Sequence, residues 1–265
     1  MDICKLPQSI PTQSRQLISI VIPTLNEEDG IERTIRSIPK ERLSDLGYNL
    51  EIIIIDGNST DQTRQIAERL GTRVILERRK GYGRAFKTGF SEAKGDILVT
   101  LDADGTYPTE LVPECIQGLK GKGLDFITTN RFSNMQNGAM NAYHKFGNDI
   151  LSLFMRLLYS IDVRDSQSGM WIMSRSFIER INIQSDDFSM SEEIKIIAFK
   201  FFKALELDWR YYKRLGQVKL ATFSDGWRNL KYLFLYRSLI KNALKSPASL
   251  LQEKSIGMDP DTYVA

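Results

Sequence analysis

The sequence predicts an α/β protein with a mainly parallel central sheet flanked by helices, followed by an amphipathic helical extension at the C-terminal end. Three features indicate this fold. Short apolar runs rich in isoleucine, valine and leucine have the composition of strands buried on both faces of a parallel sheet. These runs alternate with segments of helical periodicity, which is typical of βαβ units. Acidic and glycine-rich loops follow the runs, where ligands bind in open α/β sheets.

The first half of the chain supplies four of the expected strands. Residues 17–22 (LISIVI) form the first apolar run, and residues 50–55 (LEIIII) form the second. Between them, isoleucines at helical spacing predict a helix. The expected order is a strand over 17–22, a helix over 30–38, a strand over 50–55, a helix capped by Thr60 or Asp61 and ending at 70, a strand over 73–77, a helix over 81–93 and a strand over 97–101.

The second half is less regular, and its helices carry the clearer signals. The helix expected over 147–161 has an apolar stripe made of Ile150, Leu151, Phe154, Leu157, Leu158 and Ile161. The other expected elements are strands over 124–129, 170–173 and 205–213, a polar loop over 133–142, a turn over 165–169, a helix over 190–202 and a basic amphipathic helix from 227 to about 244.

These patterns divide the chain into four parts. Residues 1–16 are polar and lack the apolar core of a signal peptide. Residues 17–225 form the α/β domain, 226–250 a basic amphipathic helix expected to lie on a membrane surface, and 251–265 a polar, flexible tail. No uninterrupted apolar run approaches the ~20 residues of a spanning helix, so we expect peripheral attachment only. The alternative for 226–250 is a helix that packs on the domain and exposes only its basic face.

Composition excludes several classes of protein. The hydrophobic content of 42% argues against wholesale disorder, and a net charge of +3 is too small to indicate nucleic-acid binding. The two cysteines have no disulfide or metal-ligand spacing, which favours a reducing compartment. The single histidine rules out a histidine-rich zinc site.

An acidic pair, Asp102 and Asp104, follows the strand over 97–101. Residues i and i+2 share one side of an extended chain, so both carboxylates can face one cation. Hard oxygen ligands of this kind suit Mg²⁺ or Mn²⁺ held together with a substrate phosphate. An isolated pair is also typical of a solvated turn. An EF-hand is excluded, because Tyr107 and Pro113 stand where its loop needs glycine and glutamate.

Three further motifs follow earlier strands. They are PTLNE at 23–27, DGNSTD at 56–61 and GYGRA at 81–85. The last lacks the third glycine of a dinucleotide fingerprint, since Phe86 stands there, so a nicotinamide site is not expected. Arg84 and the basic residues at 78–80 flank its glycines at a helix start, which suits phosphate. The alternative is a solvated basic turn.

Together these motifs resemble the inverting family 2 glycosyltransferases of the GT-A fold. In the second half, NRF at 130–132, GN at 147–148, DSQSG at 165–169 and RLGQVK at 214–219 resemble the polyprenyl-phosphate branch, the dolichyl-phosphate hexose synthases. DADGTYP at 102–108 and the GAM segment at 138–140 look most like archaeal members. The resemblance covers roughly residues 17–240.

The resemblance implies roles for particular residues. A nucleotide-diphosphate sugar is expected to bind at Pro23, Leu25, Glu27, Asp56, Gly81, Arg84, Asp102 and Ala103. The metal ligands implied are Asp102 and Asp104, with Thr106 as a further candidate. The acceptor phosphate is expected at Arg131, Arg214 and Lys219, and the catalytic residues implied are Asp104, Asp165 and Arg131. The chain departs from the family pattern at Gly57, Thr106 and Val218, where many relatives have an acid, glutamine and serine.

Three functions are compatible with these residues. The preferred one is transfer of a hexose from a nucleotide sugar to dolichyl (polyprenyl) phosphate at the cytoplasmic face of the cell membrane, for protein N-glycosylation or surface glycans, with a membrane-anchoring partner as a further candidate. The second has a sugar hydroxyl as acceptor and needs a general base, for which Asp165 and Glu192 are candidates. The third is a non-catalytic sugar-nucleotide-binding protein. A turn-capping role for Asp165 and a solvated helix face for Glu192 and Glu193 are the structural alternatives. UDP-hexose, UDP-hexuronate and GDP-mannose all remain open as donors.

Overall fold

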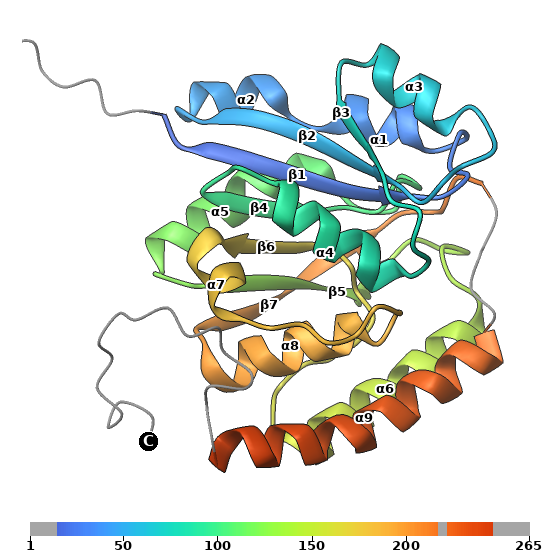
Figure 1. Cartoon of the computed structure of the whole chain (residues 1–265), viewed down its shortest axis with the longest axis vertical. Coiled ribbons are helices and arrows are strands. Elements are labelled where there is room, and N and C mark those ends of the chain that lie inside the picture. Colours follow the sequence, from blue (N-terminus) through green and yellow to red (C-terminus); the bar gives the residue numbers. More distant parts are fainter. Residues whose placement is uncertain (1–14, 217–221, 246–265) are drawn as a thin grey trace, which may run out of the picture.

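The structure, a computed structural model, describes residues 15–216 and 222–245 and is built on one twisted sheet (Figure 1). In the described residues the sheet has seven strands in the order β3-β2-β1-β4-β6-β5-β7. Of these seven described strands, only β6 runs antiparallel to its neighbours, β4 and β5. The strands are β1 (Leu17–Thr24), β2 (Asn49–Asp56), β3 (Arg73–Leu76), β4 (Ile97–Thr100), β5 (Phe126–Met135), β6 (Trp171–Ser174) and β7 (Ala204–Tyr211). The predicted mainly parallel α/β sheet is therefore confirmed.

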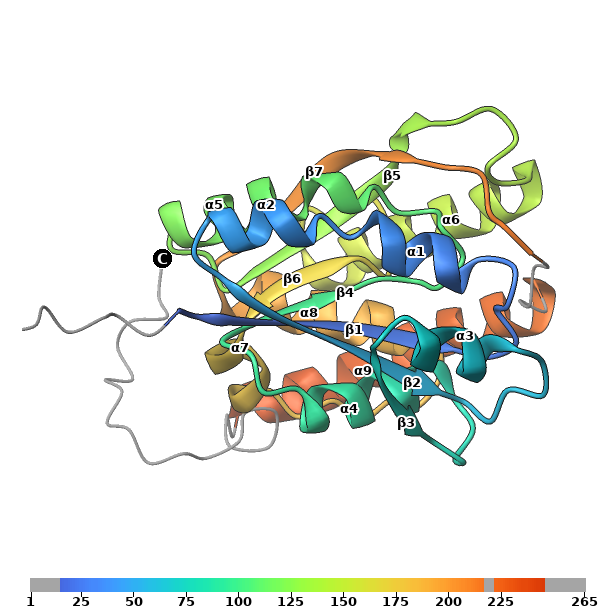
Figure 2. The ribbon, with the colours of Figure 1, turned by 90° about the horizontal axis from the view of Figure 1, so that it is seen from above.

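Helices cover both faces of the sheet. Side chains alternate along each strand, so Ile20 and Ile22 of β1 point to one face and Val21 points to the other. Figure 2 shows α1, α2 and α5 on one side, and α4, α7 and α8 on the other. The helices are α1 (Ile31–Ser37), α2 (Lys40–Asp45), α3 (Thr63–Arg69), α4 (Tyr82–Glu92), α5 (Val112–Gly121), α6 (Ala142–Tyr159), α7 (Arg175–Arg180), α8 (Met190–Phe201) and α9 (Thr222–Lys245), with a 3₁₀ turn at Thr109–Leu111.

The long helices α6 and α9 lie side by side beyond α8 and form a third apolar cluster (Figure 1). Leu233, Tyr236 and Ile240 of α9 are buried in it, and the carbonyl of Leu233 accepts a hydrogen bond from Tyr159 Oη (2.5 Å). One face of α9 therefore packs on the domain. Because α9 begins at Thr222, the domain boundary proposed after 225 falls within its first turn. No helix in the described ranges is long and apolar enough to cross a membrane.

Some elements differ from those expected. α6 begins at Ala142, where Asn141 Oδ1 accepts the N–H of His144 (2.8 Å), and not at 147. Its buried face holds Leu151, Met155 and Tyr159, whereas Leu157 of the predicted stripe is 69% exposed. β5 continues to Met135, into the predicted polar loop, because it pairs with β7 across a bulge. The helices α2, α5 and α7 were not predicted.

Helix α3 begins two residues after the expected cap. Its N-cap is Gln62, whose side chain makes no capping hydrogen bond. The expected residue Asp61 nevertheless accepts the N–H of Thr63 on its Oδ1 (3.0 Å). Asp61 therefore satisfies one of the free donors at the helix start from outside the helix.

Candidate active site

The carboxyl ends of β1, β2 and β4 bring three of the predicted motifs to one edge of the sheet. β1 and β2 end in register at Thr24 and Asp56, and β4 runs parallel beside β1. The chain leaves β4 at Thr100 and reaches Asp102 and Asp104 two and four residues later. Because parallel strands end at one edge, the sheet itself gathers these acidic groups into a single region.

Asp102 is held by residues from two other segments. Tyr82, in the first turn of α4, donates its hydroxyl to Asp102 Oδ1 (3.1 Å). A Cβ at Gly169 would lie 2.3 Å from that hydroxyl and 3.3 Å from Asp102 Oδ1, so only glycine allows this close approach. Burial, and after it the charge of Asp104, raise the pKa of Asp102 to about 7. Tyr82 and Gly169 lie within the predicted motifs at 81–85 and 165–169, but sequence reasoning gave neither a role, because no local pattern indicates that they meet Asp102.

Asp104 is almost fully buried and is bound on both oxygens. Its Oδ1 accepts the N–H (3.1 Å) and the hydroxyl (2.7 Å) of Thr106, and its Oδ2 accepts Arg214 Nη1 (2.6 Å). The second guanidinium nitrogen, Nη2, bonds Glu27 Oε1 (2.5 Å). Arg214 thus connects the loops after β1 and β4. In this arrangement the Thr106 hydroxyl orients Asp104.

The two carboxylates suit a divalent cation that is shared with a phosphate. Two neighbouring anions in a partly buried site are mutually unfavourable, and a cation between them would offset this repulsion. Asp104 Oδ1 already accepts two hydrogen bonds, but Oδ2 accepts only that of Arg214, so the second lone pair of Oδ2 leaves acceptor capacity for a metal. The described residues contain no cluster of three or more acidic, histidine or cysteine ligands. Asp102 and Asp104 would therefore hold the ion with oxygens supplied by the substrate and water.

The loops after β1 and β2 form the neighbouring part of the site. Leu25 is 47% exposed, and Glu27 donates its N–H to Thr63 Oγ1 (2.8 Å). Asp56 is fully buried and accepts Arg64 Nε (3.0 Å), Arg64 Nη2 (2.6 Å) and the N–H of Ser59 (3.1 Å). Asp56 therefore shapes the loop after β2 and orients Arg64, a residue that the motifs did not indicate.

A loop over residues 185–186 covers the first turn of α4. Gly81 has φ of +129°, and a Cβ there would lie 2.2 Å from the carbonyl oxygen of Asp186. That oxygen accepts the N–H of Arg84 (3.0 Å), and the Asp186 carboxylate accepts Arg84 Nη2 (2.5 Å). Lys87 also pairs with Asp186. Gly81 and Arg84 are thus bound to this loop, while Tyr82 between them reaches Asp102.

Arg131, in the middle of β5 beside its bulge, forms a buried pair with Asp165. Arg131 Nε and Nη2 donate to Asp165 Oδ2 (2.7 Å) and Oδ1 (2.8 Å), and the Arg131 N–H donates to Oδ2 (3.0 Å). Asn148 of α6 donates to Asp165 Oδ1 (3.0 Å), and Lys195 of α8 donates to its carbonyl (2.7 Å). Burial alone would raise the pKa of Asp165, but the charge and hydrogen bonds of Arg131 hold it well below its usual range. Asp165 is therefore a weak base.

The two glutamates of α8 are also buried, so the alternative of a solvated helix face is wrong. Glu192 Oε1 accepts Gln167 Nε2 (2.9 Å), its Oε2 has no hydrogen-bond partner among the described residues, and burial raises the pKa of Glu192 well above the usual value. Glu193 accepts the N–H groups of Gln184 (2.8 Å) and Ser185 (2.8 Å). Glu193 thereby fixes the loop that covers α4.

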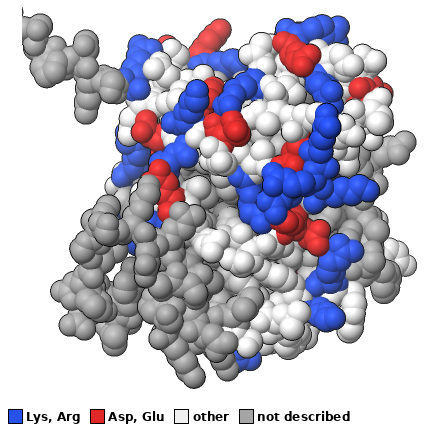
Figure 3. Space-filling model, in the orientation of Figure 1, with Lys and Arg blue, Asp and Glu red and all other residues white. Residues whose placement is uncertain are grey.

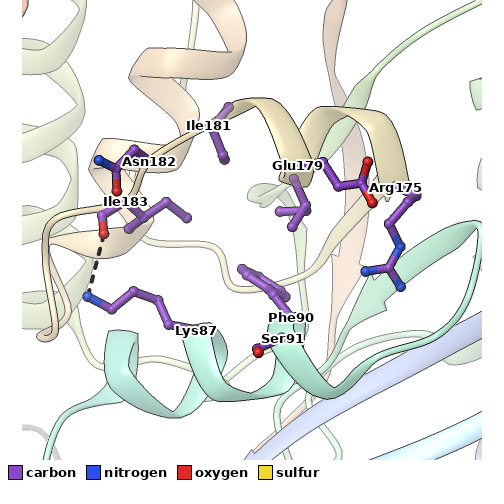
Figure 4. Close-up of a pocket in the computed structure, with 9 residues that line it drawn as sticks. Lys87, Phe90, Ser91, Arg175, Glu179, Ile181, Asn182 and Ile183 are labelled. Atoms are coloured by element: carbon purple, nitrogen blue, oxygen red, sulfur yellow. Dashed lines mark hydrogen bonds between the residues drawn. The ribbon is translucent and has the colours of Figure 1, made fainter. Parts of the chain in front are cut away.

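A surface pocket between α4 and α7 lies away from these groups (Figure 4). Its cations are already bound, Lys87 to the carbonyl of Gln184 (3.3 Å) and Arg175 to those of Ala93 (2.7 Å) and Gly95 (2.9 Å). The last two carbonyls precede β4, on the edge of the sheet opposite the acidic pair. This pocket is therefore not part of the candidate active site.

The parallel sheet and the acidic pair at the end of β4 define a protein of the nucleotide-sugar glycosyltransferase class. Residues 19–181 match the family described as glycosyl transferase family 2, and the chain belongs to that family. It is a glycosyltransferase, as its sequence predicted.

Similar proteins include members of the predicted branch. It is 33% identical over 221 residues to the low-salt glycan biosynthesis hexosyltransferase Agl6 of Haloferax volcanii, a match that covers 82% of this chain and 53% of Agl6. It is 27% identical to the dolichol-phosphate mannosyltransferase of Pyrococcus furiosus, over 86% of this chain and 66% of that protein. The chain thus spans about half to two thirds of the length of these relatives. The resemblance to the dolichyl-phosphate hexose branch is confirmed.

Solved structures confirm the GT-A-like fold. Glucosyl-3-phosphoglycerate synthase from Mycobacterium tuberculosis, crystallised with Mn²⁺, UDP and glucosyl-3-phosphoglycerate, has a TM-score of 0.67 and 24% identity. The match covers 84% of this chain and 80% of that one. At this identity the likeness concerns the fold alone.

Proposed function

We propose that this enzyme transfers a hexose from a nucleotide-diphosphate sugar to a dolichyl (polyprenyl) phosphate. The ion pair and the low pKa of Asp165 are the observations that favour a phosphate, and not a sugar hydroxyl, as the acceptor. A sugar hydroxyl needs a base to remove its proton, but Asp165 is paired with Arg131 and its pKa is low. Glu192, the other candidate base, is fully buried, and burial raises its pKa and favours its protonated form, which cannot accept a proton. A phosphate monoester has a second pKa near 6, so it is already largely an anion at pH 7 and needs no base.

The donor would bind across the ends of β1, β2 and β4. Asp102 and Asp104 would hold Mg²⁺ or Mn²⁺, which when bound supplies Lewis-acid neutralisation of the departing diphosphate. The nucleoside side is assigned to Pro23, Leu25, Glu27 and Asp56, with Gly81, Arg84 and Ala103 nearby. Glucosyl-3-phosphoglycerate synthase, which has the same fold, was itself crystallised with Mn²⁺ and UDP.

The acceptor phosphate is assigned to Arg131. Because Nε and Nη2 bond Asp165, the remaining nitrogen Nη1 is the one to meet a phosphate oxygen. That oxygen forms a bond to the anomeric carbon while the bond from this carbon to the diphosphate oxygen breaks, and the electron pair leaves with the nucleoside diphosphate. Arg214 lies between Glu27 and Asp104, so it would contact the acceptor from the donor side. Lys219, the third expected phosphate ligand, lies outside the described residues.

The surface of α6 and α9 supports attachment to a membrane. Ten large apolar side chains are exposed in the described residues, and seven of them lie on these two helices. They are Tyr143, Phe146, Leu153 and Leu157 on α6, and Trp227, Phe234 and Leu235 on α9. Phe154 of α6 contacts Phe234 of α9, with ring centroids 5.7 Å apart, so the apolar residues of the two helices adjoin. A single concentration of this kind marks an interaction surface.

Basic side chains accompany this apolar surface. Arg156 of α6 and Arg228, Lys231 and Arg237 of α9 are exposed. In Figure 3 the described surface over α9, in the lower part of the view, is mostly uncharged with separate blue side chains. Apolar atoms that enter the headgroup region, with cations beside them, suit an anionic bilayer. We therefore propose peripheral attachment at the cytoplasmic face of the cell membrane; a membrane-anchoring partner remains part of the proposal.

Replacing Phe146, Leu153 and Leu157 together by serine is expected to weaken binding to anionic liposomes at least about tenfold, because each exposed side chain loses the apolar surface that the bilayer would bury. Sedimentation with liposomes measures this, and binding of the unchanged protein should weaken with added salt. The matched control replaces Leu46 and Leu76, which are exposed elsewhere, by serine. Equal binding of both variants would place the membrane surface on another part of the chain.

The transfer itself is tested with purified protein, a panel of nucleotide sugars, polyprenyl phosphate and Mg²⁺ or Mn²⁺. A hexosyl phosphoryl polyprenol and a free nucleoside diphosphate are the expected products. Transfer to sugar hydroxyls alone would replace the phosphate acceptor by a glycan. Nucleotide-sugar binding without any turnover would show a non-catalytic binder.

A further inference from the structure

A chain of hydrogen bonds connects helix α9 with the Arg131–Asp165 pair. Asn229 of α9 is 5% exposed, and its Nδ2 donates to Gln167 Oε1 (3.2 Å). The backbone N–H of Gln167 donates to Asp165 Oδ1 (3.1 Å). The same oxygen accepts Arg131 Nη2 (2.8 Å). Three hydrogen bonds therefore connect α9, which carries part of the proposed membrane surface, with Arg131, the proposed ligand of the acceptor phosphate.

The amide of Gln167 lies between two polar partners. Its Nε2 donates to Glu192 Oε1 (2.9 Å), and its carbonyl faces α9. That carbonyl needs a donor, and Asn229 supplies one. A buried acceptor without a donor is unfavourable, so removing the amide of Asn229 favours a different placement of Gln167. A carboxylate at position 229 would place two acceptors face to face.

A second polar contact of α9 leads elsewhere. One turn further along, Tyr232 donates its hydroxyl to Glu193 Oε2 (2.9 Å). That oxygen also accepts the N–H of Ser185 (2.8 Å), in the loop that covers α4. The two contacts of α9 thus reach different loops, so substitutions at 229 and 232 separate an effect on the acceptor side from a general loosening of the helix.

We propose that Asn229 is a positioning residue for transfer to polyprenyl phosphate. Through Gln167 it fixes Asp165, and through Asp165 it fixes the guanidinium of Arg131. A change in how α9 packs on the domain therefore alters the position of Arg131 on the acceptor side of the site. This inference rests on the proposed function for its kinetic consequence. The structural part, that Asn229 holds the loop over 165–169, does not depend on the acceptor.

Steady-state kinetics of Asn229→Ala, Asn229→Asp and Tyr232→Phe test the kinetic part. Asn229→Ala is expected to raise the KM for polyprenyl phosphate about fivefold, the factor expected for one ordinary hydrogen bond, with the donor KM unchanged. Asn229→Asp should raise it further, and Tyr232→Phe should leave it unchanged. An unchanged acceptor KM in both Asn229 variants, or an equal rise in the donor KM, overturns the proposal. If the alanine variant does not fold, the near-isosteric aspartate variant decides.

Hydrogen exchange separates this proposal from the function on which it rests. The N–H groups of Arg131 and Gln167 both donate to Asp165, so their exchange reports on the pair directly. Exchange at both should be faster in Asn229→Ala than in Tyr232→Phe. Equal exchange in the two variants overturns the positioning role. If the unchanged protein does not use polyprenyl phosphate, the proposed function fails, and exchange alone then decides whether Asn229 positions the pair.

Discussion

Replacing Asp104 by asparagine is expected to lower the rate of hexose transfer by about 10³-fold, the largest effect of any single substitution proposed for this chain. The change removes one of the two carboxylates that would hold the divalent ion, and Lewis-acid stabilisation of a leaving diphosphate is worth several kcal/mol. It also removes the negative charge that Arg214 contacts at 2.6 Å. Initial rates at saturating donor and Mg²⁺ or Mn²⁺ measure the loss, and excess EDTA should abolish the activity of the unchanged protein.

Asp45→Asn is the matched control, because it makes the same chemical change at an exposed position at the end of α2. Its rate should equal that of the unchanged protein. Circular dichroism of Asp104→Asn checks that the fold persists. Full activity in excess EDTA would falsify the metal assignment, and full activity of Asp104→Asn would remove Asp104 from the site.

Replacing Arg131 by lysine is expected to lower kcat/KM for polyprenyl phosphate by about 10²-fold or more while donor affinity stays unchanged. Lysine keeps the positive charge but cannot contact both oxygens of Asp165 and a phosphate together, as the planar guanidinium can. Asp165 is fully buried, so a weakened partner also disturbs the pair itself. Acceptor saturation curves measure the first effect, and calorimetric titration with the nucleotide measures donor affinity.

Arg164→Lys provides the control for Arg131→Lys. Arg164 adjoins Asp165 in sequence, but its guanidinium is partly exposed and bonds Glu206 Oε2 (2.9 Å) and Asp208 Oδ2 (3.1 Å). Transfer by this variant should remain within about twofold of the unchanged rate, since partly exposed ion pairs contribute little. If Arg131→Lys loses nucleotide affinity while acceptor saturation stays normal, Arg131 belongs to the donor side.

The sequence was most informative where its local pattern determines the structure. The strands β1, β2 and β4 are β-branched runs, and they form at nearly the expected residues. Because parallel strands end at one edge, the position of Asp102 and Asp104 followed from the runs themselves. Helix α5 carries Val112, Cys115, Ile116 and Leu119 at helical spacing, yet it was missed. Its Pro113 stands in the first turn, where proline is tolerated because the N–H it lacks has no partner within the helix.

The partners of the site residues could not be predicted in the same way. Arg214 contacts Asp104 across 110 residues, and Arg131 contacts Asp165 across 34. Such pairs depend on how loops from separate strands meet in space, and the local sequence pattern does not indicate which loops meet. The burial of Glu192 and Glu193 could not be predicted either. Charged residues at the start of a helix usually face solvent, but these two are fully buried.

The exposed apolar side chains of α6 could not be predicted for a different reason. The helix is apolar on two opposite sides, and periodicity does not tell which side meets the domain. Packing against α8 and α9 selects the side with Leu151, Met155 and Tyr159. The expected stripe therefore mixed buried side chains with the exposed Leu157.

The most direct test of the central claim is the identity of the product formed from a nucleotide sugar and polyprenyl phosphate. With Mg²⁺ or Mn²⁺ present, mass spectrometry should detect a hexose joined to the lipid through one phosphate, together with one equivalent of nucleoside diphosphate. EDTA and Asp104→Asn should each remove this product. A glycan extended at a hydroxyl, with the polyprenyl phosphate recovered unchanged, would contradict the account.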